Sequence, residues 1–309
     1  MTEMGSNTQP ALYLAAIRWQ NEESSLEFRT EGRELPEFKT ANQLDLRFRI
    51  IADRKKRCIG TVERSKDGTT SVPCDLPAAS LRQCEKCQIK DNVAAANMHQ
   101  AHRRGREAIS KPMAAYLTHP HRLYAAIFRD GSTKIGTTRG VSGGNRLVEQ
   151  GAWYARYLAQ VEDGFMVREL EDSVTEELEI KQAVDTRKKF SGHLEPLTNQ
   201  ELIDRLDQLS NEAEGLVSKE IGTQGVLLGD RWSNPRTEDP MWNDLVAYPA
   251  AINRGAHEFT IQSMVGRLAG CNRRGFEENF LLDLQPLLAH PIETGDFEVD
   301  EFVMQDSLF

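Results

Sequence analysis

The sequence predicts an α+β protein, and three patterns along the chain support this fold class. Near the N-terminus, apolar and polar residues alternate in a way that is typical of half-buried strands. In the acidic segment 199–220, leucines recur at helical spacing. Between them, residues 119–180 combine both patterns. We therefore divide the chain into a β-rich region at 1–65, a cysteine module at 58–118, an α/β unit at 119–180 and an acidic α+β region at 181–309.

Composition narrows the class of protein. The chain has 309 residues, of which 39% are hydrophobic and 28% charged, and its mean hydropathy is −0.53. These values exclude fibrous, collagen-like and wholly disordered proteins. No apolar run approaches the roughly 18 residues that cross a bilayer, and the N-terminus has no basic segment typical of a signal peptide. We therefore expect a cytoplasmic protein with no membrane partner and with reduced cysteines.

The strands expected in residues 11–65 lie at ALYLAAIRW, SLEFRT and LDLRFRIIA. In the last of these, Leu44, Leu46, Phe48 and Ile50 would share one face of a sheet, with arginines on the other. Because the alternation is strict, we expect one face to be buried and one to be solvated.

Charge is distributed unevenly along the chain. Residues 46–146 hold 20 basic and 8 acidic residues, a net charge of +12, whereas the rest of the chain holds 18 basic and 39 acidic residues, a net charge of −21. A basic middle flanked by acidic ends favours an anionic partner such as nucleic acid. The alternative is a solvated face against which the acidic ends fold back.

Four of the five cysteines lie close together in the sequence: Cys58, Cys74, Cys84 and Cys87. The last two form a CxxC turn, which lets two thiolates bind one tetrahedral ion at about 2.3 Å. We expect Cys58 and Cys74 to complete a structural zinc site. Cysteines that bind nothing and a redox CxxC remain alternatives. Other candidate ligands are four histidines: His99, His102, His119 and His121.

Residues 119–180 have the most informative order of elements. Asp130-Gly131 is a strong hairpin turn signal, because glycine readily adopts positive φ angles. A glycine-rich stretch then leads into a helix for which Asn145 is a candidate N-cap. The expected elements are strands at 123–128 and 132–138, a helix containing Arg146, a strand at about 156–161 and a helix from about 165.

This order resembles the GIY-YIG nuclease domain, in which a hairpin bears two tripeptides and later helices carry an arginine and a metal-binding glutamate. Leu123-Tyr124-Ala125 falls at the first tripeptide and Lys134-Ile135-Gly136 at the second. Arg146 follows at a suitable distance. Glu171 is the best glutamate candidate, because its helical face borders an apolar stripe. The resemblance implies a three-stranded antiparallel sheet with flanking helices.

A narrower resemblance is to an uncharacterised branch of GIY-YIG-like proteins with a cysteine cluster upstream. Three segments carry it: His121-Arg122-Leu123-Tyr124, Lys134-Ile135-Gly136-Thr137-Thr138-Arg139 and Gln150-Gly151-Ala152. It covers residues 58–180. In this comparison, Arg139 and Gln150 are candidate substrate-binding residues.

The resemblance implies a metal-dependent nuclease that acts on nucleic acid, with DNA favoured over RNA. Glu171 would hold Mg²⁺ or Mn²⁺, Arg146 would bind the phosphate, and Tyr124 would orient or deprotonate water. His121 would act as an acid or base, or as a zinc ligand. Lys134 stands where the family has its second tyrosine, and the first tripeptide also departs from the pattern at Leu123 and Ala125. A lysine can neutralise a phosphate but is a poor base unless its pKa is strongly lowered.

Other interpretations stay open at this point. Tyr124 could be an ordinary strand aromatic, and Lys134, Arg146 and Glu171 could be solvated surface residues. The domain would then be a non-catalytic, zinc-containing nucleic-acid-binding protein on a degenerate GIY-YIG scaffold. A third interpretation is a protein-interaction module whose acidic C-terminal half docks a partner.

Overall fold

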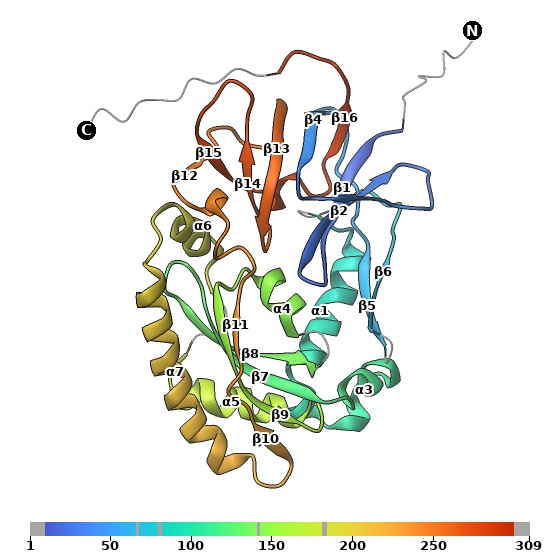
Figure 1. Cartoon of the computed structure of the whole chain (residues 1–309). Helices are drawn as coiled ribbons and strands as arrows, with labels where there is room; N and C mark the ends of the chain where they lie inside the picture. Colours follow the sequence, from blue (N-terminus) through green and yellow to red (C-terminus); the bar gives the residue numbers. More distant parts are fainter. Residues whose placement is uncertain (1–9, 66–67, 80–81, 141–142, 181–183, 300–309) are drawn as a thin grey trace.

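The structure is a computed structural model and describes residues 10–65, 68–79, 82–140, 143–180 and 184–299. Within these residues it contains seven α-helices and three sheets, of nine, five and two strands (Figure 1). The expected α+β class is therefore confirmed. No helix in this described part of the chain combines the length and the apolar character that a bilayer span needs.

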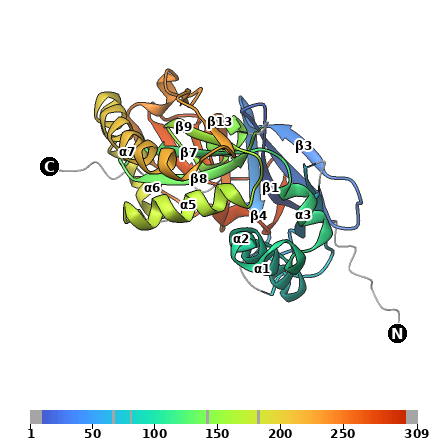
Figure 2. The ribbon, with the colours of Figure 1, turned by 90° about the horizontal axis from the view of Figure 1, so that it is seen from below.

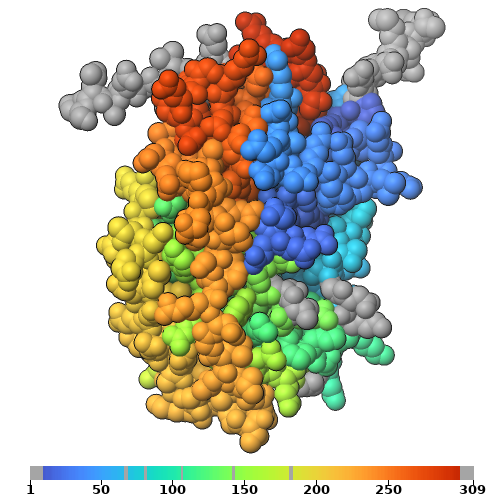
Figure 3. All heavy atoms as spheres, in the orientation of Figure 1, coloured from blue at the N-terminus to red at the C-terminus, as the bar shows by residue number. Residues whose placement is uncertain are grey.

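The largest sheet joins the two ends of the chain, as the blue and red halves of Figures 1 and 3 show. Its strands, in spatial order, are β12 (Leu245–Ala247), β15 (Asn279–Asp283), β14 (Leu268–Asn272), β13 (Ala256–Val265), β4 (Leu44–Ile50), β16 (Pro291–Thr294), β1 (Leu12–Gln20), β2 (Glu23–Thr30) and β3 (Glu37–Thr40). Phe48 lies opposite His257 and Leu46 opposite Phe259. The apolar residues of β4 thus face a core shared by N-terminal and C-terminal strands.

The second sheet carries the elements expected in residues 119–180. Its strands are β10 (Gly225–Leu227), β9 (Tyr154–Val161), β7 (His121–Ile127) and β8 (Thr133–Arg139), with β11 (Arg231–Ser233) also paired to β9. All pairings in this sheet are antiparallel, and β7 and β8 form the hairpin. The sheet has five strands where three are expected, because β10 and β11 from the C-terminal region satisfy the open edge of β9.

Helices cover both faces of this five-stranded sheet. Leu123, Ala125 and Ile127 face a core built with α5 (Met166–Glu177) and α7 (Asn199–Glu220). Tyr124, Ala126 and Phe128 face the other way and pack with Leu147 of α4 (Gly143–Gln150). This alternation follows from the two-residue period of a strand.

Two helix starts illustrate local sequence control. The capping box of Thr198 and Glu201 starts α7. Of the leucines expected at helical spacing, Leu202, Leu206 and Leu209 are buried, and Leu216 is partly buried. Asn145, in contrast, is not an N-cap, because α4 already begins at Gly143. Its Oδ1 instead accepts a 2.8 Å hydrogen bond from the backbone N–H of Glu22, in the β1–β2 turn.

The cysteine module lies beside both sheets. It contains the hairpin of β5 (Thr61–Ser65) and β6 (Gly68–Val72), followed by α1 (Glu85–His99), α2 (Ala101–Arg104) and α3 (Lys111–Leu117). Figure 2 shows these three helices grouped away from α7. A small apolar cluster ties α2 and α3 to Phe165, just before α5.

Candidate functional site: a four-cysteine cluster and a charged site beside β8

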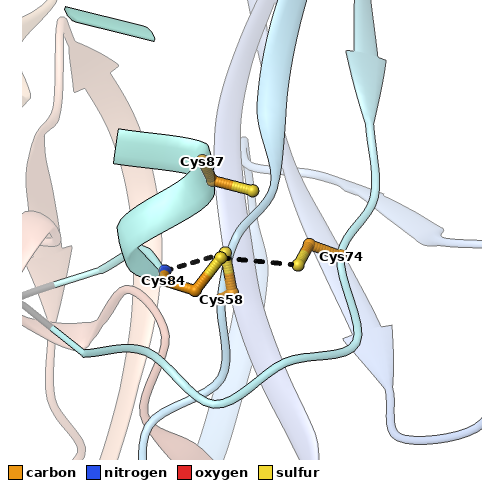
Figure 4. Close-up of side chains that lie close together, drawn as sticks. All are labelled: Cys58, Cys74, Cys84 and Cys87. Atoms are coloured by element: carbon orange, nitrogen blue, oxygen red, sulfur yellow. Dashed lines mark hydrogen bonds between the residues drawn. The ribbon is translucent and has the colours of Figure 1, made fainter. Parts of the chain in front are cut away.

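Four cysteine sulfurs converge at the start of α1 (Figure 4). The Sγ atoms of Cys58, Cys74, Cys84 and Cys87 all lie within 4.8 Å of one another. Those of Cys74 and Cys84 are 3.8 Å apart. A tetrahedral ion with Zn–S distances of about 2.3 Å places its sulfurs about 3.8 Å apart. The cluster is therefore compatible with a zinc site.

Cys58 and Cys74 do not form a CxxC turn, and a β-hairpin brings them together instead. Cys58 precedes β5 and Cys74 follows β6, so the pairing of Thr61 with Val72 brings the two cysteines together. Gly60 has a φ of +83°, and a Cβ at this position would lie 2.0 Å from the carbonyl oxygen of Val72. The turn after Cys58 therefore requires glycine.

Backbone groups stabilise the sulfurs. The Sγ of Cys58 accepts hydrogen bonds from the N–H of Cys84 at 3.2 Å and of Gly60 at 3.4 Å. A backbone hydrogen bond from Cys87 lowers the pKa of Cys84 to about 7, whereas burial raises the pKa of Cys58 and of Cys87. N–H donors aimed at sulfur favour thiolates, the form that binds a metal.

The histidines considered as alternative ligands are not part of this group in the described residues. His102 Nε2 lies 2.9 Å from Asp172 Oδ2, on α5. His121 Nδ1 lies 2.7 Å from the carbonyl oxygen of His119. The four-cysteine set is thus the ligand set that the geometry favours.

Several of the other predicted residues meet between α4, α5 and β8. We call Tyr124, Lys134, Arg146, Gln150 and Glu171 the α4–β8 site. Tyr124 of β7 is fully buried and lies directly opposite Gly136 of β8. A Cβ on Gly136 would come within 2.6 Å of Tyr124 Oη. The glycine of the second tripeptide therefore makes room for the tyrosine ring of the first.

Gln150 links this tyrosine to Arg146. Tyr124 Oη and the Gln150 amide are 3.0 Å apart. We assign the amide orientation in which its nitrogen donates to Tyr124 and its oxygen accepts two 2.9 Å hydrogen bonds from Arg146, because it satisfies all three side chains. The Arg146 side chain is 46% exposed and also pairs with Glu149 at 2.9 Å. A buried tyrosine thus anchors an arginine that solvent can reach.

Lys134 shares the sheet face of Tyr124, since it pairs with Ala126. Desolvation lowers the pKa of Lys134, and the positive charges of Arg146 and Arg168 lower it further. Burial raises the pKa of Tyr124 to about 12, so its phenol stays protonated at neutral pH. Of these two groups, only Lys134 has a pKa shifted toward neutrality.

Glu171 extends the site from α5. The residue is 7% exposed, and its carboxylate forms an ion pair with Arg168 one turn earlier. The charge of Glu171 acts on both Tyr124 and Lys134, as does that of Arg168. Glu169, two residues earlier on the same helix, is exposed.

His121 and Arg139 lie on the other side of the hairpin. They are directly opposite each other in the β7–β8 register, on the sheet face of Leu123. Both approach Tyr116, with ring centroids 5.9 Å apart for His121 and a guanidinium-to-ring distance of 5.6 Å for Arg139. Burial lowers the pKa of His121. Of the seven candidate catalytic and substrate residues, these two do not join the α4–β8 site.

Two residues near the site were not among the expected site residues. Lys189, on α6 (Thr186–Leu194), donates a 2.8 Å hydrogen bond to the carbonyl oxygen of Gln150. His99, exposed at the end of α1, lies in the field of Arg168, and desolvation together with this charge lowers its pKa. Lys189 is not part of any recognisable sequence motif, and His99 was considered only as a metal ligand. The sequence spacing alone therefore could not predict that either residue lies near the α4–β8 site.

A model of the protein family described as "Protein of unknown function (DUF2797)" matches residues 43–233. No curated protein and no solved structure matches the chain significantly. The matched segment contains both the cysteine cluster and the α4–β8 site. It also contains α6 and α7, but stops before the C-terminal strands of the nine-stranded sheet.

Proposed function

The chain belongs to the DUF2797 family, and from the α4–β8 site we propose that it is a metal-dependent nuclease. It hydrolyses phosphodiester bonds in nucleic acid, with DNA favoured over RNA, and acts in the cytoplasm. The observation that carries the proposal is the convergence of Lys134, Arg146 and Glu171 around buried Tyr124 and its partner Gln150. Two cations and a carboxylate are what a phosphodiester and a divalent ion need at one place.

The solvent exposure of each residue suggests its role in the proposed reaction. Arg146 binds the phosphate, because its planar fork suits two oxygens and its side chain is accessible. Lys134 adds a second positive charge at the position that corresponds to the second tyrosine of the GIY-YIG pattern. Tyr124 is too deeply buried to activate water, and instead holds Gln150 and thereby Arg146. His99 is neutral near pH 7 and is our candidate for the base that accepts the proton from water.

The two metals have separate places. The four cysteines form a closed set, so the Zn²⁺ that we assign to them is structural. Mg²⁺ or Mn²⁺ belongs at Glu171, because such ions commonly bind one or two carboxylates together with substrate phosphates. When bound, the ion would stabilise charge on the phosphate and on the leaving oxygen. Before Glu171 can hold a metal ion, its ion pair with Arg168 must break. The substrate phosphate can then replace the carboxylate as the partner of Arg168.

A cleavage assay tests the proposal. Purified protein is mixed with labelled single-stranded, duplex and branched DNA and with RNA, in Mg²⁺ or Mn²⁺, with an EDTA control. We expect Glu171→Gln to abolish cleavage and His99→Gln to slow it, while Glu169→Gln, an exposed neighbour on the same helix, cuts like the wild type. Cleavage that survives in Glu171→Gln or in EDTA would refute the assignment of the metal site.

A second candidate function is non-catalytic binding of nucleic acid. The ion pair between Glu171 and Arg168 favours it, because it already neutralises the carboxylate. In that case the wild type binds DNA without cutting any substrate, the affinity falls steeply with salt, and Glu171→Gln binds as well as the wild type. Arg146→Met would weaken DNA binding under either function.

A further inference from the structure

A hollow of about 210 Å³ opens beside the α4–β8 site. Three elements line it: the end of α4 with Gln150, the inward-facing side of α6 with Lys189 and His193, and the β13–β14 turn with Arg267. Val265 and Leu268 add an apolar wall. This volume is below that of drug-sized ligand sites, so the hollow suits only a small ligand. No step of the proposed nuclease reaction uses this hollow.

Polar groups around the hollow lack partners in the described part of the chain. His193 is 4% exposed, and its Nδ1 makes no hydrogen bond. The Nε of Arg267 is also buried and unbonded, although its Nη2 pairs with Asp283 at 2.7 Å. Buried polar atoms are usually satisfied in native proteins, so these two atoms, together on residues that line one hollow, are available to a ligand.

Lys189 brings a charge that the described residues do not neutralise. It forms no ion pair there: its Nζ donates to the carbonyl oxygen of Gln150 and stands 3.7 Å from the centroid of the Phe128 ring. An ammonium group has three N–H donors. At least one therefore remains for a ligand in the hollow.

The excess of positive charge around the hollow favours an anionic ligand. Burial lowers the pKa of Lys189 to about 8, and the charges of Lys134, Arg267 and Arg146 lower it too, whereas the carboxylate of Asp130 raises it. Another cation, Arg129, acts on His193, whose pKa burial lowers to about 3, so this ring is neutral. Glu149 on the rim is paired with Arg146. A dianion relieves this excess better than a monoanion.

We propose that the hollow between α4, α6 and the β13–β14 turn binds a small phosphate monoester through Lys189, Arg267 and His193. Three donors from two separate elements suit a tetrahedral group with three terminal oxygens. Val265 and Leu268 then contact the apolar part of the ligand. The site is distinct from the metal site at Glu171, and the proposal stands whether or not the protein cuts nucleic acid.

Calorimetric titration of the full-length protein with inorganic phosphate and with adenosine 5′-monophosphate tests this site. Lys189→Met keeps the length of the side chain and removes the charge, and we expect it to weaken binding about tenfold or more. Lys188→Met, an exposed neighbour on α6, is the matched control and should bind like the wild type. Unfolding curves without ligand show whether each variant is folded.

A second measurement locates the phosphate. The ring nitrogens of His193, assigned by their absence in His193→Gln, should shift on addition of phosphate in a nitrogen-detected spectrum. Arg146→Met should keep this shift, because Arg146 belongs to the neighbouring site. The proposal is overturned if the wild type binds neither probe, if Lys189→Met binds as tightly as the wild type, or if only Arg146→Met loses binding.

Discussion

Gly136 offers the sharpest test of how the hairpin builds the α4–β8 site. In Gly136→Ala, the new Cβ would stand 2.6 Å from Oη and 2.7 Å from Cζ of Tyr124. Carbon atoms that touch without strain are about 3.5–4.0 Å apart. The ring is fully buried and cannot swing into solvent. The alanine must therefore displace the ring and break its contact with Gln150.

The expected loss of stability follows from these two effects. Overpacking a well-filled core costs about 1–3 kcal/mol, and losing one hydrogen bond costs about 1 kcal/mol. The free energy of unfolding should therefore fall by roughly 2–4 kcal/mol. Gly215, within α7, is the matched control, because a Cβ there meets nothing within 4 Å. Gly215→Ala should raise stability by about 0.5–1 kcal/mol.

Urea unfolding followed by tryptophan fluorescence measures both changes, with the slope of the transition unchanged. DNA affinity gives a second readout, because a displaced Tyr124 no longer holds Gln150 and Arg146 in place. We expect Gly136→Ala to weaken binding and Gly215→Ala to leave it intact. A Gly136→Ala protein that unfolds within about 0.5 kcal/mol of the wild type would refute the packing argument.

Metal and pH give two further predictions. Elemental analysis should find one zinc ion per chain that is lost in Cys74→Ser and kept in Cys271→Ala, since Cys271 is buried in the core of the nine-stranded sheet and is not part of the cluster. Equal zinc content in both variants would contradict the assignment. Phosphate affinity should fall as the pH rises above about 8, because Lys189 in the free protein then loses its proton and phosphate binding must restore it. This pH dependence of the affinity should vanish in Lys189→Met. If the affinity of Lys189→Met still falls with pH, another group titrates.

Local sequence patterns predicted the elements near the site, because those elements depend on neighbours in the chain. Asp130-Gly131 forms the β7–β8 turn, with Gly131 at a φ of +80°. The alternation of β7 placed Tyr124 and His121 on opposite faces, which separates their environments. Such signals act over a few residues, and tertiary packing here reinforces them.

Long-range pairing could not be predicted in the same way. The alternating pattern of β4 shows that one face is buried, but not that Phe48 meets His257, more than two hundred residues away. The hydrogen-bonding edge of a strand carries no side-chain signature of its partner. For the same reason, the sequence does not predict that β10 and β11 extend the second sheet, or that Arg267 lies near Lys189.

The cysteine cluster and the α4–β8 site are connected by α1. Cys84 is the N-cap of this helix, and His99 is its last residue. Cys87 is its one buried residue in the described chain, so an apolar core contributes little to the helix. We therefore expect the cysteines that start α1 to add to its stability, together with the packing of Ala94 and Met98 on α2 and α3. The length of α1 places His99 in the field of Arg168 and Lys134. A structural metal in the cluster would act on the charged site through this helix, without touching any residue of it.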